Sequence, residues 1–203
     1  MPSENSIKAA LAFIENDKSK VLGLKVGPHT NVETGQYIPR AGMSFIHLSS
    51  GHLVTVIFPE KLKLMLYNHI DAQDAPTLSF SAASPTKTYL AISLDIDAPF
   101  PSFGVLGPIL HWIQPNVTVS GASLKTDGPF VANYIGPAPP PGSSPHRYTF
   151  FLYEQPEGFD YKKYAPEGGK TLSNWGRMRY DLDAWAKEIG LGEVVVFNYF
   201  TSN

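Results

Sequence analysis

Apolar residues follow helical spacing in two parts of this 203-residue chain. Near the N-terminus, Ile7 and Ile14 belong to a helically spaced apolar set, which predicts a helix over residues 6–22. A second apolar stripe predicts another helix over 173–189, and Gly190 follows it as a stop signal. Both helices have one apolar face, so each is expected to pack against another element.

Between and after these segments, the pattern changes to runs rich in β-branched and aromatic residues. Residues 42–66 predict a hairpin and a further alternating strand, and residues 87–95 and 147–154 predict two strongly apolar strands. Residues 194–200 predict a buried strand after the second helix. This order of elements indicates a β-rich α+β protein in which antiparallel sheets pack together with peripheral helices.

The composition agrees with one globular domain over residues 1–203. Charged residues make up only 17% of the chain, and it contains 17 Gly and 18 Pro, which favours many loops over long surface helices. Two segments, 99–108 and 137–145, are so dense in Pro and Gly that they are predicted to be loops.

Several classes of function are excluded or disfavoured by the same counts. Without Cys, the chain forms no disulfide, thiolate nucleophile, zinc–thiolate site or iron–sulfur cluster. The net charge is −2 with no basic cluster, so we expect no nucleic-acid partner. We also expect no transmembrane segment and no signal peptide, and hence a cytoplasmic location.

Candidate chemistry begins at the end of the strand over 87–95. In an extended chain Asp95 and Asp97 would share one face, with Cα atoms roughly 6.5–7 Å apart, and two such close carboxylates raise one pKa. The alternative, given equal weight, is an ordinary strand end where Asp begins a turn before Pro99.

Two histidines are further candidates. His111 has only apolar neighbours, which favours a hydrogen-bonded core histidine over a ligand, whereas His146 follows a loop, where binding residues concentrate. An iron site would need Asp95 or Asp97 beside both histidines, which spacing alone does not establish. We predict no metal and no cofactor.

Three segments together resemble the boxes of the phosphatidylethanolamine-binding protein family. Asp95–Pro99 resembles its D-P-D-A-P box, His111 lies in an L-H-W segment 14 residues beyond Asp97, and His146–Tyr148 resembles the end of its G-x-H-R-Y box. The stretch from Tyr134 to Pro140 also matches the family's Y-x-G-x-x-P-P pattern. The resemblance is specific over residues 85–155.

The resemblance implies a large antiparallel sheet packed on a smaller one, with a helical segment over residues 1–30 and a pocket-forming core over 85–155. In the family, this pocket binds phosphate or a phospholipid head group. Arg147 is expected to form a structural ion pair. By position, the pocket residues would be Asp95, Asp97, Pro99, Phe100, Leu106, Ile109, His111, Pro140, His146 and Tyr148.

The sequence also departs from the family pattern. Phe100 replaces Ser or Thr, and Leu106 and Ile109 replace aromatic residues, so the rim of the pocket becomes more apolar. An apolar rim favours an amphipathic ligand over a plain head group. The family has a cis peptide bond where this chain has Gly107–Pro108, and proline lowers the cost of the cis form, so we predict a cis bond there.

Three functions follow from this reading. The first is a module that binds a phosphate, lipid-like or other amphipathic small molecule without changing it. The second is an enzyme in which Asp95, His111 and His146 act as acid and base in the isomerisation, cyclisation or dehydration of a hydrophobic metabolite. The third, implied by the resemblance, is an inhibitor of a serine carboxypeptidase or a signalling partner of a protein such as a kinase.

Overall fold

The structure, a computed structural model, describes residues 2–39 and 72–203. The predicted hairpin and strand over 42–66 lie outside these residues. The helical elements are α1 (Glu4–Asn16), η1 (Lys18–Lys20), η2 (Tyr161–Lys163), η3 (Glu167–Gly169) and α3 (Leu182–Ile189). The strands are β1 (Gly23–Lys25), β2 (Thr77–Ser79), β3 (Tyr89–Asp95), β4 (Ile109–Ser120), β5 (Ser123–Lys125), β6 (His146–Glu154) and β7 (Val194–Ser202).

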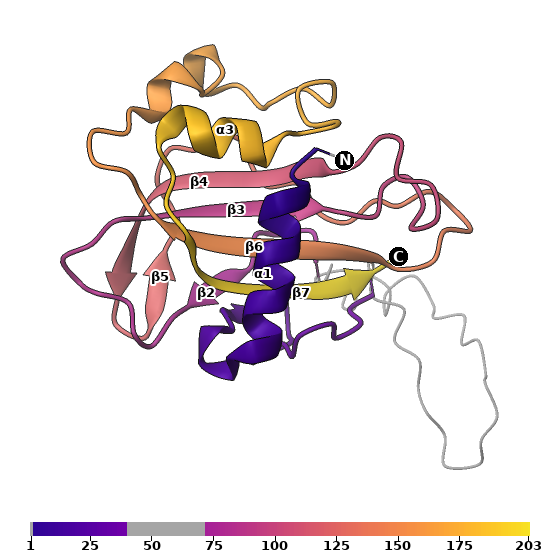
Figure 1. The fold of residues 1–203 in the computed structure, drawn as a ribbon, viewed down its shortest axis with the longest axis horizontal. Helices are drawn as coiled ribbons and strands as arrows, with labels where there is room; N and C mark the ends of the chain where they lie inside the picture. Colours follow the sequence, from indigo (N-terminus) through magenta and orange to yellow (C-terminus); the bar gives the residue numbers. More distant parts are fainter. Residues whose placement is uncertain (1, 40–71) are drawn as a thin grey trace, which may run out of the picture.

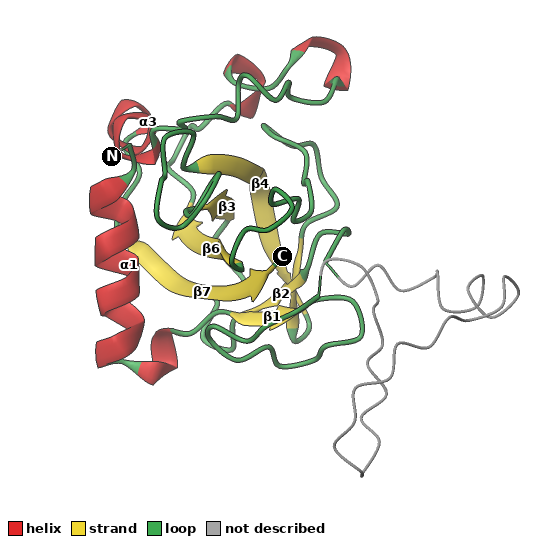
Figure 2. Ribbon diagram, turned by 90° about the vertical axis from the view of Figure 1, so that its right-hand side faces the viewer, coloured by secondary structure: helices red, strands yellow, loops and turns green. Residues whose placement is uncertain are grey.

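The described strands form one antiparallel sheet in the order β1-β2-β5-β4-β3-β6-β7. The sheet curves until its two ends nearly meet, as Figure 2 shows. The N–H of Leu22, just before β1, donates to the carbonyl of Phe197 in β7 at 3.0 Å and links those ends. The β-rich, antiparallel fold is therefore confirmed, and its two expected layers are continuous with each other.

The long strand β4 connects the two layers of the sheet. Its first half pairs with β3 and its last residues pair with β5. The pattern analysis did not predict β4, because Pro115 lies inside it and proline ordinarily argues against a central strand. Here Asn116 adopts a positive φ of 57° and the register with β3 shifts, so the chain accommodates Pro115 at an irregularity.

Apolar side chains on the two faces of the sheet build two cores. The inner core includes Leu24, Leu78, Tyr89, Trp112, Tyr148, Phe150 and Phe200. The outer core includes Ile7, Ile14, Ile92, Phe151, Leu182, Trp185 and Phe197. Helices α1 and α3 cover the outer face, with α1 across β6 and β7 (Figure 1). Strands β3, β6 and β7 match the predicted strands, since their side chains are buried on both faces.

The N-terminal helix is shorter than predicted. Helix α1 ends at Asn16, because the Asp17 side chain accepts the N–H of Ser19 and starts a separate 3-10 turn. Val21, which continued the helical pattern in sequence, instead forms a bridge with Phe197 of β7.

The C-terminal helix is also shorter than predicted. Helix α3 begins at Leu182, where the Asp181 side chain accepts the N–H of Ala184 as an N-cap. Residues 173–181 form turns, with Arg179 at a positive φ of 52°. Gly190 ends the helix as predicted, in the left-handed conformation that glycine tolerates best.

Candidate functional site

The candidate residues lie at one end of the curved sheet. Strand β3 ends at Asp95, which pairs with Ile109 at the start of β4 and with Tyr148 in β6. His146, the first residue of β6, pairs with Ser202 at the end of β7. The antiparallel register therefore brings residues far apart in sequence to the end of the sheet that also carries the C-terminus (Figure 1).

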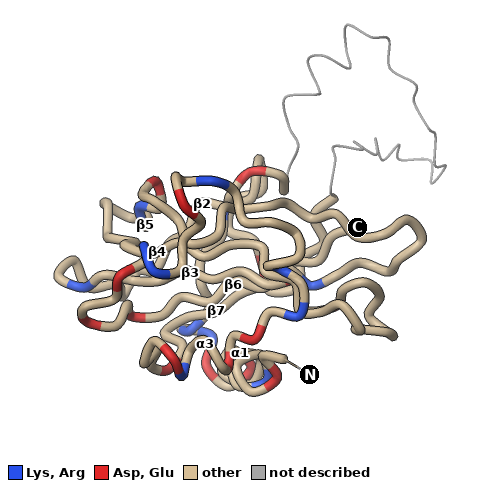
Figure 3. Tube along the Cα trace, turned by 90° about the horizontal axis from the view of Figure 1, so that it is seen from above, with Lys and Arg blue, Asp and Glu red and all other residues tan. Residues whose placement is uncertain are grey.

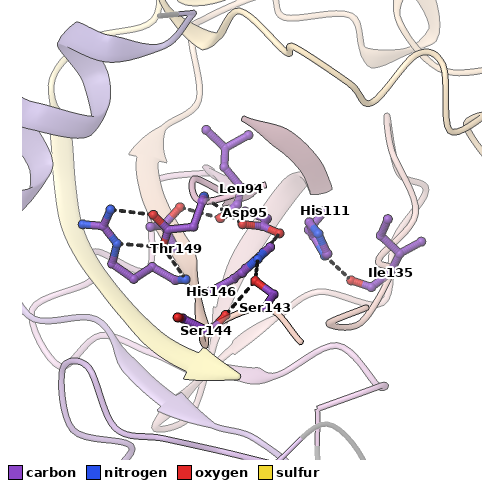
Figure 4. A network of polar contacts seen from close by, with 10 residues as sticks. Leu94, Asp95, His111, Ile135, Ser143, Ser144, His146 and Thr149 are labelled. Carbon is purple, nitrogen blue, oxygen red and sulfur yellow. Dashed lines mark hydrogen bonds and ion pairs between the residues drawn. The ribbon is translucent and has the colours of Figure 1, made fainter. Parts of the chain in front are cut away.

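Three side chains form a row of hydrogen bonds at this end. Asp95 Oδ2 lies 2.8 Å from His146 Nδ1, and His146 Nε2 lies 2.8 Å from Ser143 Oγ (Figure 4). Asp95 and His146 are buried, with 3% and 0% of their surface exposed. The Ser143 hydroxyl also donates to the carbonyl of Ser144 at 2.9 Å.

This arrangement favours the protonated form of His146. A hydroxyl has one proton, so while Ser143 donates to the Ser144 carbonyl, His146 Nε2 must donate to Ser143 Oγ. Burial by itself would lower the pKa of His146, but the hydrogen bond and charge of Asp95 outweigh it and raise that pKa above its ordinary value. The contacts with Asp95 and Ser143 thus favour the imidazolium form of His146.

His111 lies beside this row in a different electrostatic environment. Its Nδ1 donates to the carbonyl of Ile135 at 2.7 Å, which leaves Nε2 as the unprotonated nitrogen of a neutral ring. Burial lowers the pKa of His111, against the opposing effect of Asp95. The edge of its ring meets the ring of Tyr148, with 5.0 Å between the centroids. Two histidines whose pKa values are shifted in opposite directions therefore lie at the same end of the sheet.

An extended segment was expected to place Asp95 and Asp97 on one face as a carboxylate pair. In the structure the two side chains do not form this pair. The chain bends at residues 96–97, and Asp95 Oδ1 accepts the N–H of Asp97 at 2.9 Å. Asp97 instead accepts three hydrogen bonds from Arg147, two from its guanidinium and one from its backbone N–H, at 2.7–2.9 Å. The expected structural ion pair of Arg147 is confirmed, and the carboxylate of Asp97 is fully engaged in it.

The predicted apolar rim is exposed. Phe100 and Leu106 are each 39% exposed, and Phe103 and Val105 of the same loop reach 63% and 46%. The loop is tied at its base to Arg179, whose backbone N–H donates to the Leu106 carbonyl and whose Nη1 donates to the Val105 carbonyl, both at 3.0 Å. These side chains are presented outward from a fixed base.

The remaining predicted rim positions are half-buried: Pro99, Ile109 and Pro140. The peptide bond between Gly107 and Pro108 is cis, as predicted, and the bond before Pro99 is also cis. A Cβ on Gly107 would lie 2.9 Å from the Ala98 carbonyl, so only glycine fits where the two ends of the loop meet.

Charge is absent from both loops that project at this end. No Asp, Glu, Lys or Arg occurs in residues 98–124 or in residues 128–146. Figure 3 shows both projecting loops without charged positions. Arg177 donates to the carbonyls of Leu110 and Asn133 within these ranges, and Arg179 donates to the carbonyl of Val105.

Comparisons with known proteins bear on this arrangement. Residues 29–200 match the family model described as phosphatidylethanolamine-binding protein. The chain belongs to this family. Protein N of the phomoidride biosynthesis cluster of Talaromyces stipitatus is 33% identical over 150 residues, which cover 64% of this chain and 72% of that protein.

A second curated relative of this family member is the carboxypeptidase Y inhibitor of Saccharomyces cerevisiae. It is 43% identical over 67 residues, which cover 33% of this chain and 30% of the inhibitor. The crystal structure of carboxypeptidase Y inhibitor complexed with its cognate proteinase superposes with a TM-score of 0.64 at 21% identity, over 98% of this chain and 95% of that one. That likeness concerns the fold.

Two residues of the site, Ser143 and Arg177, were not predicted from the sequence. Ser143 follows Gly142 in a loop, and only its contact with His146 distinguishes it from its neighbour Ser144. Arg177 was placed in a predicted helix, yet it is 1% exposed. No local signal separates it from an ordinary surface arginine.

The buried guanidinium of Arg177 contacts the segment that carries His111. It donates to the carbonyls of Leu110, His111, Asn133 and Leu172 and to the Asn133 side chain. Within the described residues, these partners are all neutral oxygens. Burial lowers the pKa of Arg177, but an arginine stays protonated, so a buried positive charge lies next to His111.

The structure also has features away from this site. A cleft of about 380 Å³ is lined by residues including Phe130, Tyr161 and Glu167, and by none of the predicted site residues. In the described part of the chain, no three His, Asp or Glu side chains are grouped to hold a metal ion. None of its helices is long and apolar enough to span a membrane.

Proposed function

We propose that this protein binds a small amphipathic molecule, an apolar body with one anionic group, at the end of the sheet that carries His111 and His146. The charges of the site support an anion. Asp95 balances His146 and Asp97 balances Arg147, whereas Arg177 has only neutral oxygens as described partners. The uncompensated charge of Arg177 beside His111 is the observation that carries this proposal.

The two histidines define how the anionic group is held. In the neutral ring His111 Nε2 carries no proton, so it accepts a hydrogen bond from the O–H of a singly charged phosphate. Alternatively, it takes up a proton from solvent as the anion binds. In either case, binding raises the pKa of His111, because a negative charge favours the imidazolium.

The rim supports an apolar body on the ligand. Phe100, Phe103, Val105 and Leu106 lie in a loop without charge, next to the bend that positions Asp97. Removing such side chains from water is favourable, and a few polar groups then fix the orientation of the ligand.

Titration calorimetry with decyl phosphate tests the proposal. We expect binding with proton uptake near neutral pH, shown by a binding enthalpy that depends on the ionisation enthalpy of the buffer. His111→Ala should abolish binding, whereas His29→Ala, at a histidine that is not among the predicted site residues, should retain it. Absence of binding by the wild-type protein, or equal affinity in His111→Ala, would overturn the proposal. Native mass spectrometry of protein from its own source would then identify the physiological ligand.

A second function, an acid–base enzyme, is favoured by a separate observation. One histidine has a raised pKa and its neighbour a lowered one, which is the division of roles that acid–base catalysis requires. The relative in Talaromyces stipitatus is named for a biosynthesis cluster. Incubation with small molecules extracted from the source cells should then yield a new isomer or dehydration product. His146→Ala should reduce this conversion at least 100-fold while the variant stays folded.

A protease partner is supported by the carboxypeptidase Y inhibitor among the relatives. Carboxypeptidase Y activity, measured with and without this protein, tests it directly. Deleting residues 1–22 would be the natural variant, but α1 contributes Ile7, Ala10 and Ile14 to the outer core. Surface substitutions on α1, such as Lys8→Glu, therefore test this partner without removing part of the core.

A further inference from the structure

Ser143, His146 and Asp95 reproduce the order of atoms found in serine nucleophiles that are activated by histidine. Ser143 Oγ lies 2.8 Å from His146 Nε2, and His146 Nδ1 lies 2.8 Å from Asp95 Oδ2 (Figure 4). We propose that Ser143 is a catalytic nucleophile that accepts an acyl group from a carboxylic ester.

The backbone around Ser143 presents the hydroxyl for attack. The N–H of Ser143 donates to the Pro140 carbonyl at 3.1 Å and closes a tight turn in which Gly142 has a φ of 80°. A Cβ built on Gly142 would have no atom within 4 Å, so open space lies next to the turn. Ser143 is 8% exposed while His146 is fully buried. Of the two residues, Ser143 is therefore the more exposed.

A donor for the developing oxyanion is also present. In serine hydrolases, the N–H of the residue after the nucleophile often stabilises the negative oxygen of the tetrahedral intermediate. Here that residue is Ser144, which is exposed. Its N–H makes no hydrogen bond to any residue that the structure describes. This N–H is available to a substrate carbonyl bound at Ser143.

The hydroxyl of Ser143 has two acceptors within reach, and the protonation of His146 selects between them. While His146 is an imidazolium, the hydroxyl donates to the Ser144 carbonyl. Once Nε2 loses its proton, the hydroxyl donates to Nε2, and the imidazole becomes the general base.

The titratable and charged groups around His146 set the pH at which this change occurs. Asp95 and Asp97 both favour the imidazolium and raise the pKa of His146. His111 and Tyr148 are the neighbouring titratable groups with aromatic rings, and Arg147 is held by Asp97. Acylation is therefore expected to speed up as the pH rises through the raised pKa of His146.

The proposed reaction balances without a cofactor. Ser143 Oγ attacks the ester carbonyl carbon, its proton moves to His146 Nε2, and the C=O electron pair moves onto oxygen. The intermediate collapses, the C–O bond to the alcohol breaks, and His146 gives its proton to the departing alkoxide. Water then repeats these steps on the acylated Ser143 and releases the carboxylic acid. Asp95 stabilises the imidazolium formed at each stage.

A fluorophosphonate probe and the full chain test this nucleophile. We expect one adduct per chain by intact mass, located at Ser143 by peptide mapping, and slow hydrolysis of p-nitrophenyl butyrate. Ser143→Ala should abolish the adduct, and Ser144→Ala, at the exposed neighbouring serine, should retain it. His146→Gln should reduce the labelling rate at least 100-fold, since it removes the general base.

The outcomes separate this proposal from the proposed binding function. No adduct on the wild-type protein, an adduct at another serine, or equal labelling of Ser143→Ala would overturn it. Binding of decyl phosphate by the wild-type protein is measured separately from its labelling by the probe. Labelling without phosphate binding would reject the binding function alone, and phosphate binding without labelling would reject the nucleophile alone.

Discussion

His111 and His146 show how much the surroundings of one residue type decide its chemistry. Both are buried at the same end of the sheet, yet one faces a carbonyl and the other a carboxylate. A carbonyl oxygen accepts from the neutral ring without adding a full charge, whereas the carboxylate of Asp95 stabilises the imidazolium. The pKa values of the two rings are therefore shifted in opposite directions.

An NMR titration of the imidazole resonances checks this difference. The pKa of His146 should lie above the ordinary value of about 6.5 and that of His111 below it. His111→Gln removes one set of resonances and so assigns the two. Two pKa values on the same side of the ordinary value would contradict the electrostatics described here.

Asp95→Asn should destabilise the protein more in mild acid than in mild base. The raised pKa of His146 stabilises the fold below the unfolded-state pKa, and this contribution is lost as the pH rises through the folded-state pKa. We expect a loss of about 2–3 kcal/mol in the free energy of unfolding at pH 5.5 and about 1 kcal/mol at pH 8, typical of charged and neutral hydrogen bonds.

Urea unfolding of wild type and Asp95→Asn at both pH values gives this comparison. His111 contributes in the opposite direction, with stability that is present above its unfolded-state pKa and lost as the pH falls. Because Asp95 opposes the lowered pKa of His111, its loss lowers that pKa further and adds to the destabilisation in acid. A destabilisation that is equal at the two pH values would show that Asp95 does not act through the charge of His146.

At the scale of elements, the two helices depend on each other. Asp183 in α3 accepts the backbone N–H groups of Asn5 and Ser6 and the Ser6 hydroxyl, at the start of α1. Burial would raise the pKa of Asp183, but these hydrogen bonds outweigh it and lower that pKa. In return, Ser3 before α1 accepts the N–H of Leu182 at the start of α3. The start of each helix is therefore capped by the other.

Asp183→Ala should reduce the free energy of unfolding by about 1–2 kcal/mol, as expected for lost capping hydrogen bonds. Amide hydrogen exchange should also speed up at Asn5 and Ser6. Asp181→Ala is the matched control, because Asp181 caps only its own helix. If both variants left exchange in α1 unchanged, α1 would be held by its apolar face alone.

Elements with local signals were predictable, and those set by distant contacts were not. Strands β3, β6 and β7 are continuous apolar runs, and Gly190 marks the end of α3. The β4 strand contains Pro115, and the turns around Arg177 have the spacing of a helix, so local pattern gave the wrong structure for both. Tertiary contacts decided these segments, since Arg177 bonds to residues 66 and 67 positions away.

In the candidate site, too, the positions of some residues were predictable from local sequence, whereas the contacts between them were not. Asp95, His111 and His146 carry a recognisable motif, so their positions were predictable, as was the cis bond before Pro108. The contact between Asp95 and His146 spans 51 residues and depends on the pairing of β3 with β6. For that reason the opposite pKa shifts of the histidines and the contact of Ser143 with His146 follow only from the folded chain.

At the scale of the whole molecule, the apolar cores that stabilise the fold and the residues of the proposed binding site lie in different parts of the protein. The curved sheet holds two apolar cores, one on each face, while the end carrying the site has two loops without charge. Asp95, His111 and His146 are buried, whereas the exposed side chains of the loop that follows Asp97 are Phe100, Phe103, Val105 and Leu106. Polar and apolar parts of a ligand would therefore contact separate residues.

This separation predicts a dependence of affinity on chain length in a series of alkyl phosphates. Each methylene that becomes buried contributes about 0.8 kcal/mol, or roughly fourfold in affinity, until the rim is covered. The double variant Phe103→Ser/Leu106→Ser should flatten this dependence and leave the affinity for methyl phosphate unchanged. His111→Ala should abolish binding of every member of the series. Affinities independent of chain length in the wild type would mean that the rim does not contact the ligand.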